Sequence, residues 1–481
     1  MCNIRLSRVR LHSSLTMHAF CVVVLASLFA MPGAAPSTLA QPSIENSIVV
    51  ADPGEADVSA LGLIEAELSP SPALAVTRDS SSLASFTLDL TSASDRRLLP
   101  QNLGPNVNST GTELGPVIAP DGRTLFYTRG GSDGDQDIWF SRVDSSGDWS
   151  SAERMPYPLT NRFNNFVESV TPDGNTLLIG GRYLGYSAIV TGLSMTHRTL
   201  TGWREPEALR IRNYYSRSKS VSSCLGSDGQ TLVMSLDREG GAGQQDLHVS
   251  FRRDDGEWTE PLNLDTVVNT NAIDFAPFLA ADGVTLYFSS KGHGGFGEAD
   301  IFVTRRLDST WRNWSTPENL GATINSDEWD AYYVIPASGE YVYFGSVNNS
   351  LGQSDLVRVP LPKAVRPKAV ALLSGHVYNA KTNEPMDAMI RYETLPDGLE
   401  VGIARTDPKT GGFAIALPAG KEYAFRAEAA GFLGVGSSID LKVLDTYVET
   451  RQDLTMVPME MGQVVGLQNI FFDFAQSQLR A

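Results

Sequence analysis

Alternating apolar and polar residues recur in short runs from about residue 95 onwards, and most of these runs follow a tight-turn signal. Strict alternation is typical of a strand with one buried face, and an Asp-Gly pair marks a sharp reversal of the chain. The signal returns at intervals of about 54 residues, which predicts five copies of one β-unit. Its aspartates are Asp121, Asp173, Asp228 and Asp282, and a degenerate copy follows at Ser338-Gly339.

Two other positions recur in nearly every unit. The first is an aspartate that opens the third strand, and the second is a tryptophan shortly before a Pro or Glu. A unit of about 54 residues with four short strands predicts a blade of a β-propeller. We expect the aspartate to accept hydrogen bonds from backbone N–H groups in the turn before its strand, and the tryptophan to fill the wedge between neighbouring blades. The aspartates are Asp137, Asp246, Asp300 and Asp355, and the tryptophans are Trp149, Trp203, Trp258 and Trp314.

The two ends of the repeated region match each other. Residues 98–104 resemble residues 315–321, and Asn108 then matches Asn325. The fifth unit lacks its last strand, so residues 96–104 are predicted to supply it, which closes the ring and leaves no exposed edge. We therefore expect an all-β chain with a five-bladed propeller; six blades, with the sixth drawn from residues 45–95, are the alternative.

The chain changes character outside the repeats. Short strands separated by turns predict a small β-sandwich after the propeller, and a segment rich in Ser, Ala, Pro and Asp before it predicts a flexible spacer. The predicted order is a signal peptide in 1–40, the spacer in 41–94, the propeller in 95–362, a linker in 363–370, the sandwich in 371–456 and a further segment in 457–481.

The first 40 residues have the order of a secretory signal peptide. Arginines precede an apolar run from Ala19 to Met31, and small residues then lead to Ala40. The run is too short to span a bilayer, since that needs about 20 residues, and no other segment is long and apolar enough. After cleavage Cys224 is the one remaining cysteine, so no intrachain disulfide is expected. These features predict an exported protein.

The net charge and the lack of known catalytic motifs argue against two classes of function, nucleic-acid binding and catalysis. The formal net charge of -17 argues against binding to a phosphate backbone, so no nucleic-acid partner is expected. The six His include no pair at metal-ligand spacing such as H-E-x-x-H, and no G-x-S-x-G elbow occurs. We therefore expect a protein that is not an enzyme and has no cofactor or metal. The alternative is a secreted hydrolase acting on polysaccharide or peptide in the propeller channel, where a pair of carboxylates would be needed.

The loop from Asp133 to Asp137 has the alternate carboxylates of a calcium site, which present hard oxygen ligands. In the third unit, Ala242 and Gln244 occupy the positions equivalent to Asp133 and Asp135. The position of Asp137 alone recurs, which favours a structural role for that aspartate.

Residues that break the repeat are the candidates for a binding surface, because variable loops on a rigid ring often carry function. One such segment is basic and aromatic on an otherwise acidic chain, and a second one is aromatic. The first contains Tyr214, Tyr215, Arg217 and Lys219, and the second contains Trp329, Tyr332 and Tyr333. For the tryptophans that recur once per unit, packing is favoured over a sugar-stacking surface.

Several segments resemble known families. The Asp-Gly units resemble the WD40-like repeats of TolB-like periplasmic propellers. The segment from Ser374 to Val377, with Asn383-Glu384-Pro385, resembles a transthyretin-like, carboxypeptidase-regulatory-like domain. The tail that begins at Val457 and includes residues 469–474 resembles the entry strand of an OmpA-like peptidoglycan-binding domain. In this order, the segments resemble envelope proteins of the OmpA family.

The resemblance implies a non-catalytic scaffold of the bacterial envelope, in the periplasm or at the outer membrane. Its propeller would bind a partner protein or a cell-wall polymer. In that family the residues that hold peptidoglycan follow the entry strand, and this sequence ends at Ala481. We therefore expect a truncated OmpA-like domain, with peptidoglycan as a partner only if a missing C-terminal domain exists.

Overall fold

The computed structural model describes residues 99–130, 135–184, 189–347, 350–434 and 436–459. The predicted signal peptide and spacer lie outside these residues. Residues 460–481 of the predicted OmpA-like segment also lie outside them. The described residues form an all-β protein of strands and turns, with a short 3-10 helix, η2 (Lys363–Val365). In these ranges no helix has the length and apolar character needed to cross a membrane.

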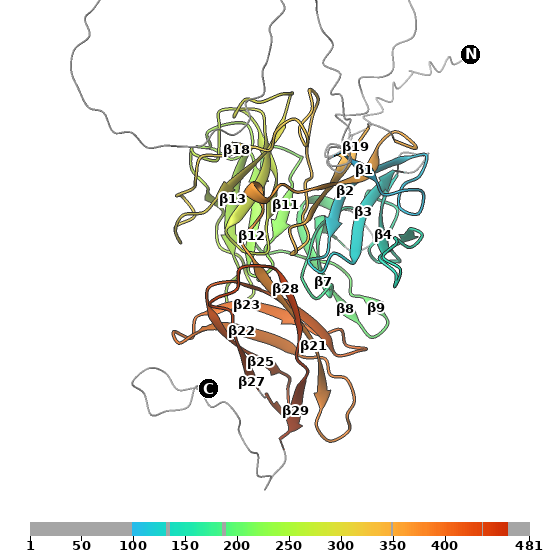
Figure 1. Cartoon of the computed structure of the whole chain (residues 1–481), viewed down its shortest axis with the longest axis vertical. Coiled ribbons are helices and arrows are strands. Elements are labelled where there is room, and N and C mark those ends of the chain that lie inside the picture. The colour runs from blue at the N-terminus through green and yellow to red at the C-terminus, as the bar shows by residue number, and fades with distance from the viewer. Residues whose placement is uncertain (1–98, 131–134, 185–188, 348–349, 435, 460–481) are drawn as a thin grey trace, which may run out of the picture. The chain divides into compact units, whose positions relative to one another are not determined.

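Five antiparallel sheets in residues 101–360 form a propeller-like fold (Figure 1). In the first four, each long strand pairs with the next one along the chain, and we number these sheets 1 to 4 in chain order. Sheet 1 contains β2 (Thr112–Ile118), β3 (Thr124–Gly130), β4 (Gln136–Arg142) and β5 (Glu153–Arg154). Sheet 2 contains β6 (Val167–Val170), β7 (Thr176–Tyr183), β8 (Ile189–Thr199), β9 (Gly202–Trp203) and β10 (Glu207–Ala208). Sheet 3 contains β11 (Ser223–Leu225), β12 (Thr231–Leu236), β13 (Asp246–Phe251) and β14 (Leu262–Asn263), and sheet 4 contains β15 (Asp274–Leu279), β16 (Thr285–Ser290), β17 (Asp300–Arg305) and β18 (Glu318–Asn319).

Sheet 5 joins the two ends of this region. Strand β20 (Asp355–Pro360) pairs on one side with β19 (Tyr341–Ser346) and on the other with β1 (Gln101–Asn102). Figure 1 shows β1 and β19 together, although they come from opposite ends of the repeated region. The prediction that residues 96–104 supply the last strand of the fifth unit is confirmed for Gln101 and Asn102.

The Asp-Gly signals fold as turns between the first and second strands of a sheet. In sheet 4, Asp282 Oδ1 accepts hydrogen bonds from the backbone N–H groups of Val284 and Thr285. Its Oδ2 accepts one from the Thr285 hydroxyl. Gly283 has a φ of +65°, a conformation that side chains with a Cβ rarely adopt. The aspartate and the glycine therefore each meet a separate demand of the turn, which explains why the pair recurs.

Neighbouring sheets share hydrophobic cores, and the recurring tryptophans lie in these cores. Trp258 of the third unit is 1% exposed and lies in one core with Leu178 and Leu193 of sheet 2. The other three pack in the same way against the sheet that precedes their own, with sheet 5 preceding sheet 1. They are Trp149, Trp203 and Trp314. Each tryptophan thus fills the wedge between two sheets, as the repeat predicted.

The core between sheets 4 and 5 has no such tryptophan. Leu361 lies in it, and Val365 of helix η2 packs against it. The Tyr287 hydroxyl of sheet 4 also donates a hydrogen bond to the Val365 carbonyl oxygen. The segment that follows the last strand therefore fills the wedge where the fifth unit lacks its tryptophan.

Residues 370–458 form two further sheets that share one core, which includes Leu373, Ile390, Ile415 and Phe425. One sheet contains β21 (Val370–Asn379), β24 (Gly412–Pro418), β26 (Phe432–Leu433), β28 (Val448–Arg451) and β29 (Leu454–Pro458). The other contains β22 (Met389–Leu395), β23 (Glu400–Arg405), β25 (Glu422–Glu428) and β27 (Gly436–Asp440). Strand β29 pairs with β26 through Val457 and Pro458. These two residues, which the resemblance placed in the next domain, are thus part of this pair of sheets.

Candidate functional site

The recurring aspartates tie the third strand of a sheet to its fourth. In sheet 4, Asp300 accepts hydrogen bonds from two backbone N–H groups of the preceding loop and from the Asn319 side-chain amide. Asn325 donates to Asn319 Oδ1 and exchanges two further hydrogen bonds with the backbone of Ile301. We call this set an Asp–Asn–Asn bracket. Equivalent brackets are Asp246, Asn263 and Asn269 in sheet 3 and Asp355, Asn102 and Asn108 in sheet 5.

Sheet 1 keeps the aspartate, but Arg154 occupies the position of the first asparagine. Arg154 Nε donates to Asp137 Oδ2 at 2.7 Å, and the arginine side chain is half exposed. Asp133, the candidate calcium ligand, lies outside the described residues. Within the described ranges no group of three or more His, Cys, Asp or Glu side chains could hold a metal ion.

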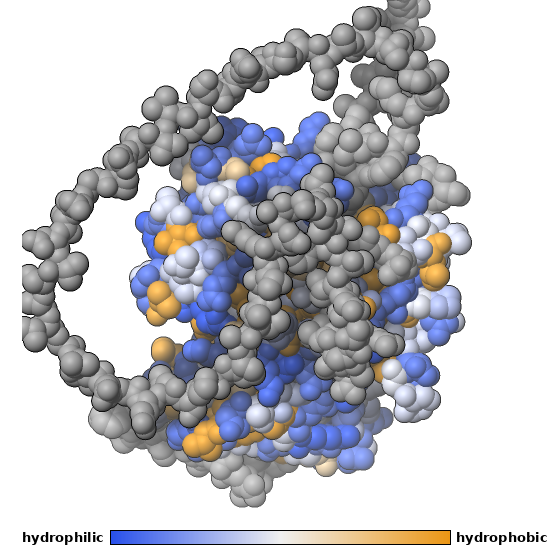
Figure 2. Space-filling view, turned by 45° about the horizontal axis from the view of Figure 1, so that its top comes forward, coloured by the Kyte–Doolittle hydropathy of each residue, from blue (hydrophilic) through white to orange (hydrophobic). Residues whose placement is uncertain are grey.

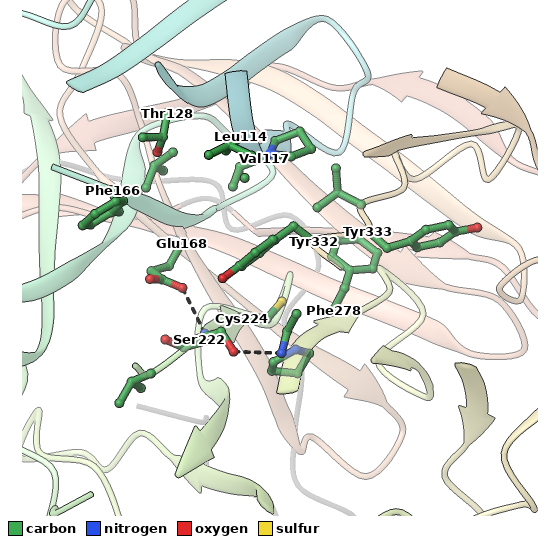
Figure 3. A pocket seen from close by; sticks show the side chains of 18 residues that line it. Leu114, Val117, Thr128, Phe166, Glu168, Ser222, Cys224, Phe278, Tyr332 and Tyr333 are labelled. Atoms are coloured by element: carbon green, nitrogen blue, oxygen red, sulfur yellow. Dashed lines mark hydrogen bonds between the residues drawn. The ribbon is translucent and has the colours of Figure 1, made fainter. Parts of the chain in front are cut away.

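The five units differ from one another at one position ahead of the turn signal, and three of the first strands have irregular pairing there. The register shifts between Leu114 and Val117 in β2, between Val167 and Ser169 in β6, and between Phe275 and Phe278 in β15. Such bulges turn side chains away from the regular alternation of a strand. The residues at this position line one cavity, shown in Figure 3. In order from sheet 1 to sheet 5 they are Gly115 and Pro116, Glu168, Ser222 and Ser223, Ala276 and Pro277, and Tyr332 and Tyr333.

The cavity is small and largely apolar. Its volume is about 70 Å³, which on this measure is room for a few water-sized groups, since one water needs roughly 10–15 Å³. Leu114, Val117, Phe166 and Phe278 contribute apolar walls, and no Lys, Arg or His is among the lining residues. A ligand of this cavity would therefore be small, and any positive charge in it would have to come from that ligand.

Glu168 is the one carboxylate among the residues that line the cavity. Its Oε2 accepts a hydrogen bond from the Ser223 backbone N–H at 3.0 Å, and it has no ion-pair partner among the described residues. Gly180 in β7 leaves room for this side chain, because a Cβ there would lie 2.9 Å from Glu168 Oε1. Burial raises the pKa of Glu168 to about 7. Charged and neutral forms are therefore both present near neutral pH.

A second carboxylate on these strands is already neutralised. Glu113 in β2 is fully buried and forms an ion pair with Arg129, whose Nε lies 2.8 Å from Glu113 Oε1. The Ser109 backbone N–H also donates a hydrogen bond to Glu113. Glu113 is not among the residues that line the cavity. It therefore serves to hold the strand.

The thiol of Cys224 also borders the cavity. Burial raises its pKa to about 11. Since the thiolate is the reactive form of cysteine, this thiol is unreactive at neutral pH.

The basic and aromatic segment that was predicted to bind a partner is only partly exposed. Tyr214 packs against the core between sheets 2 and 3, and burial raises its pKa to about 12. Tyr215, Arg217 and Lys219 are exposed. Arg217 forms an ion pair with Asp237. The segment thus presents one aromatic ring and two cations, one of them already paired.

Trp329, Tyr332 and Tyr333 do not form a single exposed cluster. Tyr333 is 2% exposed, and its ring stacks on Tyr287 with the centroids 5.3 Å apart. The Trp329 ring packs against a phenylalanine of β15 and lies 4.1 Å from the Lys291 ammonium. Tyr332 lines the cavity. Proximity in sequence did not translate into one surface, because Tyr333 is buried in the core while Trp329 and Tyr332 stay partly exposed.

The sequence contained a signal for Glu168 that went unused. Pro116 and Pro277 occupy the equivalent position in the first and fourth units, just before the turn signal. A glutamate at a position that elsewhere carries Pro, Ser or Tyr breaks the repeat, and residues that break a repeat are candidates for function.

No protein-family model and no curated protein sequence matches this chain. Among solved structures, TolB from Acinetobacter baumannii is similar with a TM-score of 0.35 and 14% identity, over 53% of this chain and 56% of that one. The endo-arabinase from Bacteroides thetaiotaomicron VPI-5482 has a TM-score of 0.35 and 13% identity, over 53% of this chain and 98% of that one. The GH62 alpha-L-arabinofuranosidase catalytic domain from Coprinopsis cinerea has a TM-score of 0.36 and 12% identity, over 55% and 97%. This chain thus spans about half the length of the TolB chain, and these distant likenesses favour neither a binding protein nor a hydrolase.

Proposed function

We propose that this protein is a non-catalytic binding scaffold of the bacterial cell envelope. In this proposal a five-bladed, TolB-like propeller binds a partner protein or a cell-wall polymer, and a carboxypeptidase-regulatory-like sandwich follows it. The observation that supports the proposal best is the single carboxylate, Glu168, among the residues that line the cavity. Most glycoside hydrolases need two carboxyl groups on either side of the scissile bond.

The exposed residues Tyr215, Arg217 and Lys219 are the proposed contacts for the partner. An exposed ring beside cations suits an acidic polymer or an acidic protein surface, because it combines stacking with charge attraction. The face drawn in Figure 2 is mainly hydrophilic, with apolar residues scattered over its coloured part. The hydrophilic character of that face supports a polar contact with a partner there rather than an apolar contact.

Binding can be tested by co-sedimentation of the purified protein with isolated cell-wall sacculi and with membrane vesicles from an envelope fraction. We expect retention on one of these, and a severalfold loss in a Tyr215→Ala/Arg217→Ala double variant. Arg312→Ala, which removes an exposed arginine of another unit, is the matched control. Equal retention of the double variant and wild type would remove these residues from the proposed contact.

The second candidate is a hydrolase, and one observation favours it. A carboxyl group with a pKa of about 7 is suited to act as a general acid. Release of reducing ends from arabinan or peptidoglycan, or cleavage of a peptide, distinguishes the two candidates if it is compared between wild type and Glu168→Gln. We expect no release by either protein; turnover by wild type that is lost in the variant would establish the hydrolase instead.

The proposed envelope location rests on the leader-like order of the first 40 residues. The intact mass of the native protein from an envelope fraction tests it. A mature N-terminus near residue 41 is expected, and a species that keeps residues 1–40 would contradict export. The same mass reports whether a domain follows residue 481 and hence whether peptidoglycan is a possible anchor.

A further inference from the structure

The cavity combines three features that together define a ligand class. It has one carboxylate, an aromatic and apolar wall, and no cationic side chain of its own. In Figure 3 Glu168 lies between Phe166 and Tyr332, and all three belong to the lining of this cavity. Each keeps part of its surface accessible, so a solute can reach them.

We propose that the cavity binds a small alkylammonium group, with Glu168 as its counter-charge and the rings of Phe166 and Tyr332 as its wall. Aromatic faces attract organic cations, and the attraction is strongest where water is excluded. A carboxylate with an unpaired charge supplies the charge-assisted hydrogen bond for the N–H donors. This site is separate from the proposed partner contacts at Tyr215 and Arg217.

The size of the cavity supports a small cation. About 70 Å³ accommodates an ammonium nitrogen with one or two carbons, or the end of a lysine side chain, but not a sugar residue of a polymer. A divalent metal is disfavoured because it requires several hard oxygen ligands. In the described part of the chain, no cluster of three or more potential metal ligands was found here or elsewhere.

The position of Glu168 is built into the fold. The bulge in β6 re-aims this residue, the Ser223 N–H fixes Oε2, and Gly180 leaves the space that the carboxyl occupies. In the equivalent positions of the other sheets the residues are Pro116, Ser223, Pro277 and Tyr333. The charge therefore comes from one unit of the ring, which gives the site a single orientation.

Charge on Glu168 should control the affinity. Burial raises its pKa to about 7, so the carboxyl becomes charged as the pH rises from 6 to 8, while an alkylammonium keeps its proton. The neighbouring titratable groups are Cys224, Tyr214 and Tyr332. Cys224 and Tyr214 have pKa values raised to about 11 and about 12 by burial, so they stay neutral in this range. The positive charge of Arg182 acts on Tyr214 and lowers the pKa of that tyrosine, against the larger effect of burial.

The test is calorimetric titration of the full chain with methylammonium chloride in phosphate buffer at pH 8, against sodium chloride at equal ionic strength. We expect saturable binding of methylammonium and none of sodium. Glu168→Gln should weaken it about tenfold or more, as expected for loss of a hydrogen bond to a charged group. Glu318→Gln, which removes an exposed carboxylate outside the cavity, should leave it unchanged.

Three further arms keep the proposal open to refutation. Affinity of wild type should fall from pH 8 to pH 6, and Tyr332→Ala should bind severalfold more weakly than Tyr332→Phe. These two results decide the matter if Glu168→Gln does not fold. Nα-acetyl-lysine amide in place of methylammonium distinguishes a lysine side chain of a partner from a free amine. Equal binding by wild type and Glu168→Gln, or equal binding of sodium and methylammonium, would overturn the proposal, whatever the outcome with sacculi.

Discussion

The Asp–Asn–Asn brackets and the cavity-lining positions recur in the same repeated region, but they differ in how much they vary. Three sheets repeat the bracket with the same residue types and the same hydrogen bond from the first asparagine to the aspartate. At the cavity-lining position the same units present Ser223, Pro277 and Tyr333, and sheet 2 presents Glu168. The fourth strands of three sheets therefore carry a repeated structural demand, whereas the cavity-lining position of each unit contributes something different to one site.

The difference has a physical reason. A bracket satisfies backbone groups of its own unit, so every unit that has the same turn needs the same side chains. A cavity on the first strands is shared by all the units, and its chemistry depends on the sum of their contributions. Residues at the cavity-lining position can vary without disturbing the repeated unit. A repeated fold can therefore acquire a specific site at this position.

The largest expected effect concerns the wedge between two sheets. Trp258→Ala should lower the free energy of unfolding by about 3–5 kcal/mol, because a fully buried ring is replaced by a void. Urea unfolding followed by circular dichroism measures it. If Leu361→Ala, in the wedge without a tryptophan, has the larger effect, the segment at the end of the ring contributes more to closure than the tryptophans do.

The next effect sharpens the comparison between units that have a bracket and sheet 1. Asp300→Ala leaves two backbone N–H groups and the Asn319 amide without their acceptor, and should lower the free energy of unfolding by about 2–3 kcal/mol. Arg154→Ala removes the pairing of a half-exposed arginine with Asp137 and should change it by less than about 1 kcal/mol. Equal losses in the two variants, measured by urea unfolding, would mean that the bracket is no stronger than this exposed ion pair.

The smallest effect is the pH dependence at the cavity. The pKa of Glu168 is raised to about 7 in the folded state, so the folded protein holds its proton where the unfolded chain has lost it. Stability therefore falls as the pH rises from about 4.5 to 7 and then levels off. A pKa that rises from about 4.5 to about 7 corresponds to roughly 3 kcal/mol, and the partial exposure of the side chain lowers this to about 2 kcal/mol. Glu168→Gln should lack this component, so its stability relative to wild type should increase with pH.

This measurement needs a buffer without amines, since an alkylammonium ligand would restore stability to the wild type at pH 8. Asp173 also has a raised pKa, about 6, and contributes in the same direction. The informative quantity is therefore the difference between the variant and the wild type. A difference that is constant from pH 5 to 8 would show that the carboxyl of Glu168 is not perturbed by burial, with Glu318→Gln as the control.

Much of the fold was predictable because its causes are local. Turn aspartates, turn glycines and alternating strands satisfy nearby backbone groups, so their spacing marked the units and the match between residues 98–104 and 315–321 indicated the closure. Segment η2 was not predicted to replace a tryptophan, because which side chain fills a wedge depends on the neighbouring sheet. Trp329, Tyr332 and Tyr333 were grouped by proximity in sequence, and the fold separates Tyr333 into the core.

By itself, the sequence determined the β-class, the turns, the repeated unit and the closing strand. Each unit contains the residues that satisfy its own backbone hydrogen bonds and bury its own apolar face, so these features recur with the period of the repeat. Only the tertiary structure decided that a bulge in β6 aims Glu168 at a cavity whose other walls come from four other units. That outcome depends on residues that are up to about 220 positions apart in the sequence. The charge of Glu168 is available to a ligand because no cationic side chain is among the residues that line this cavity.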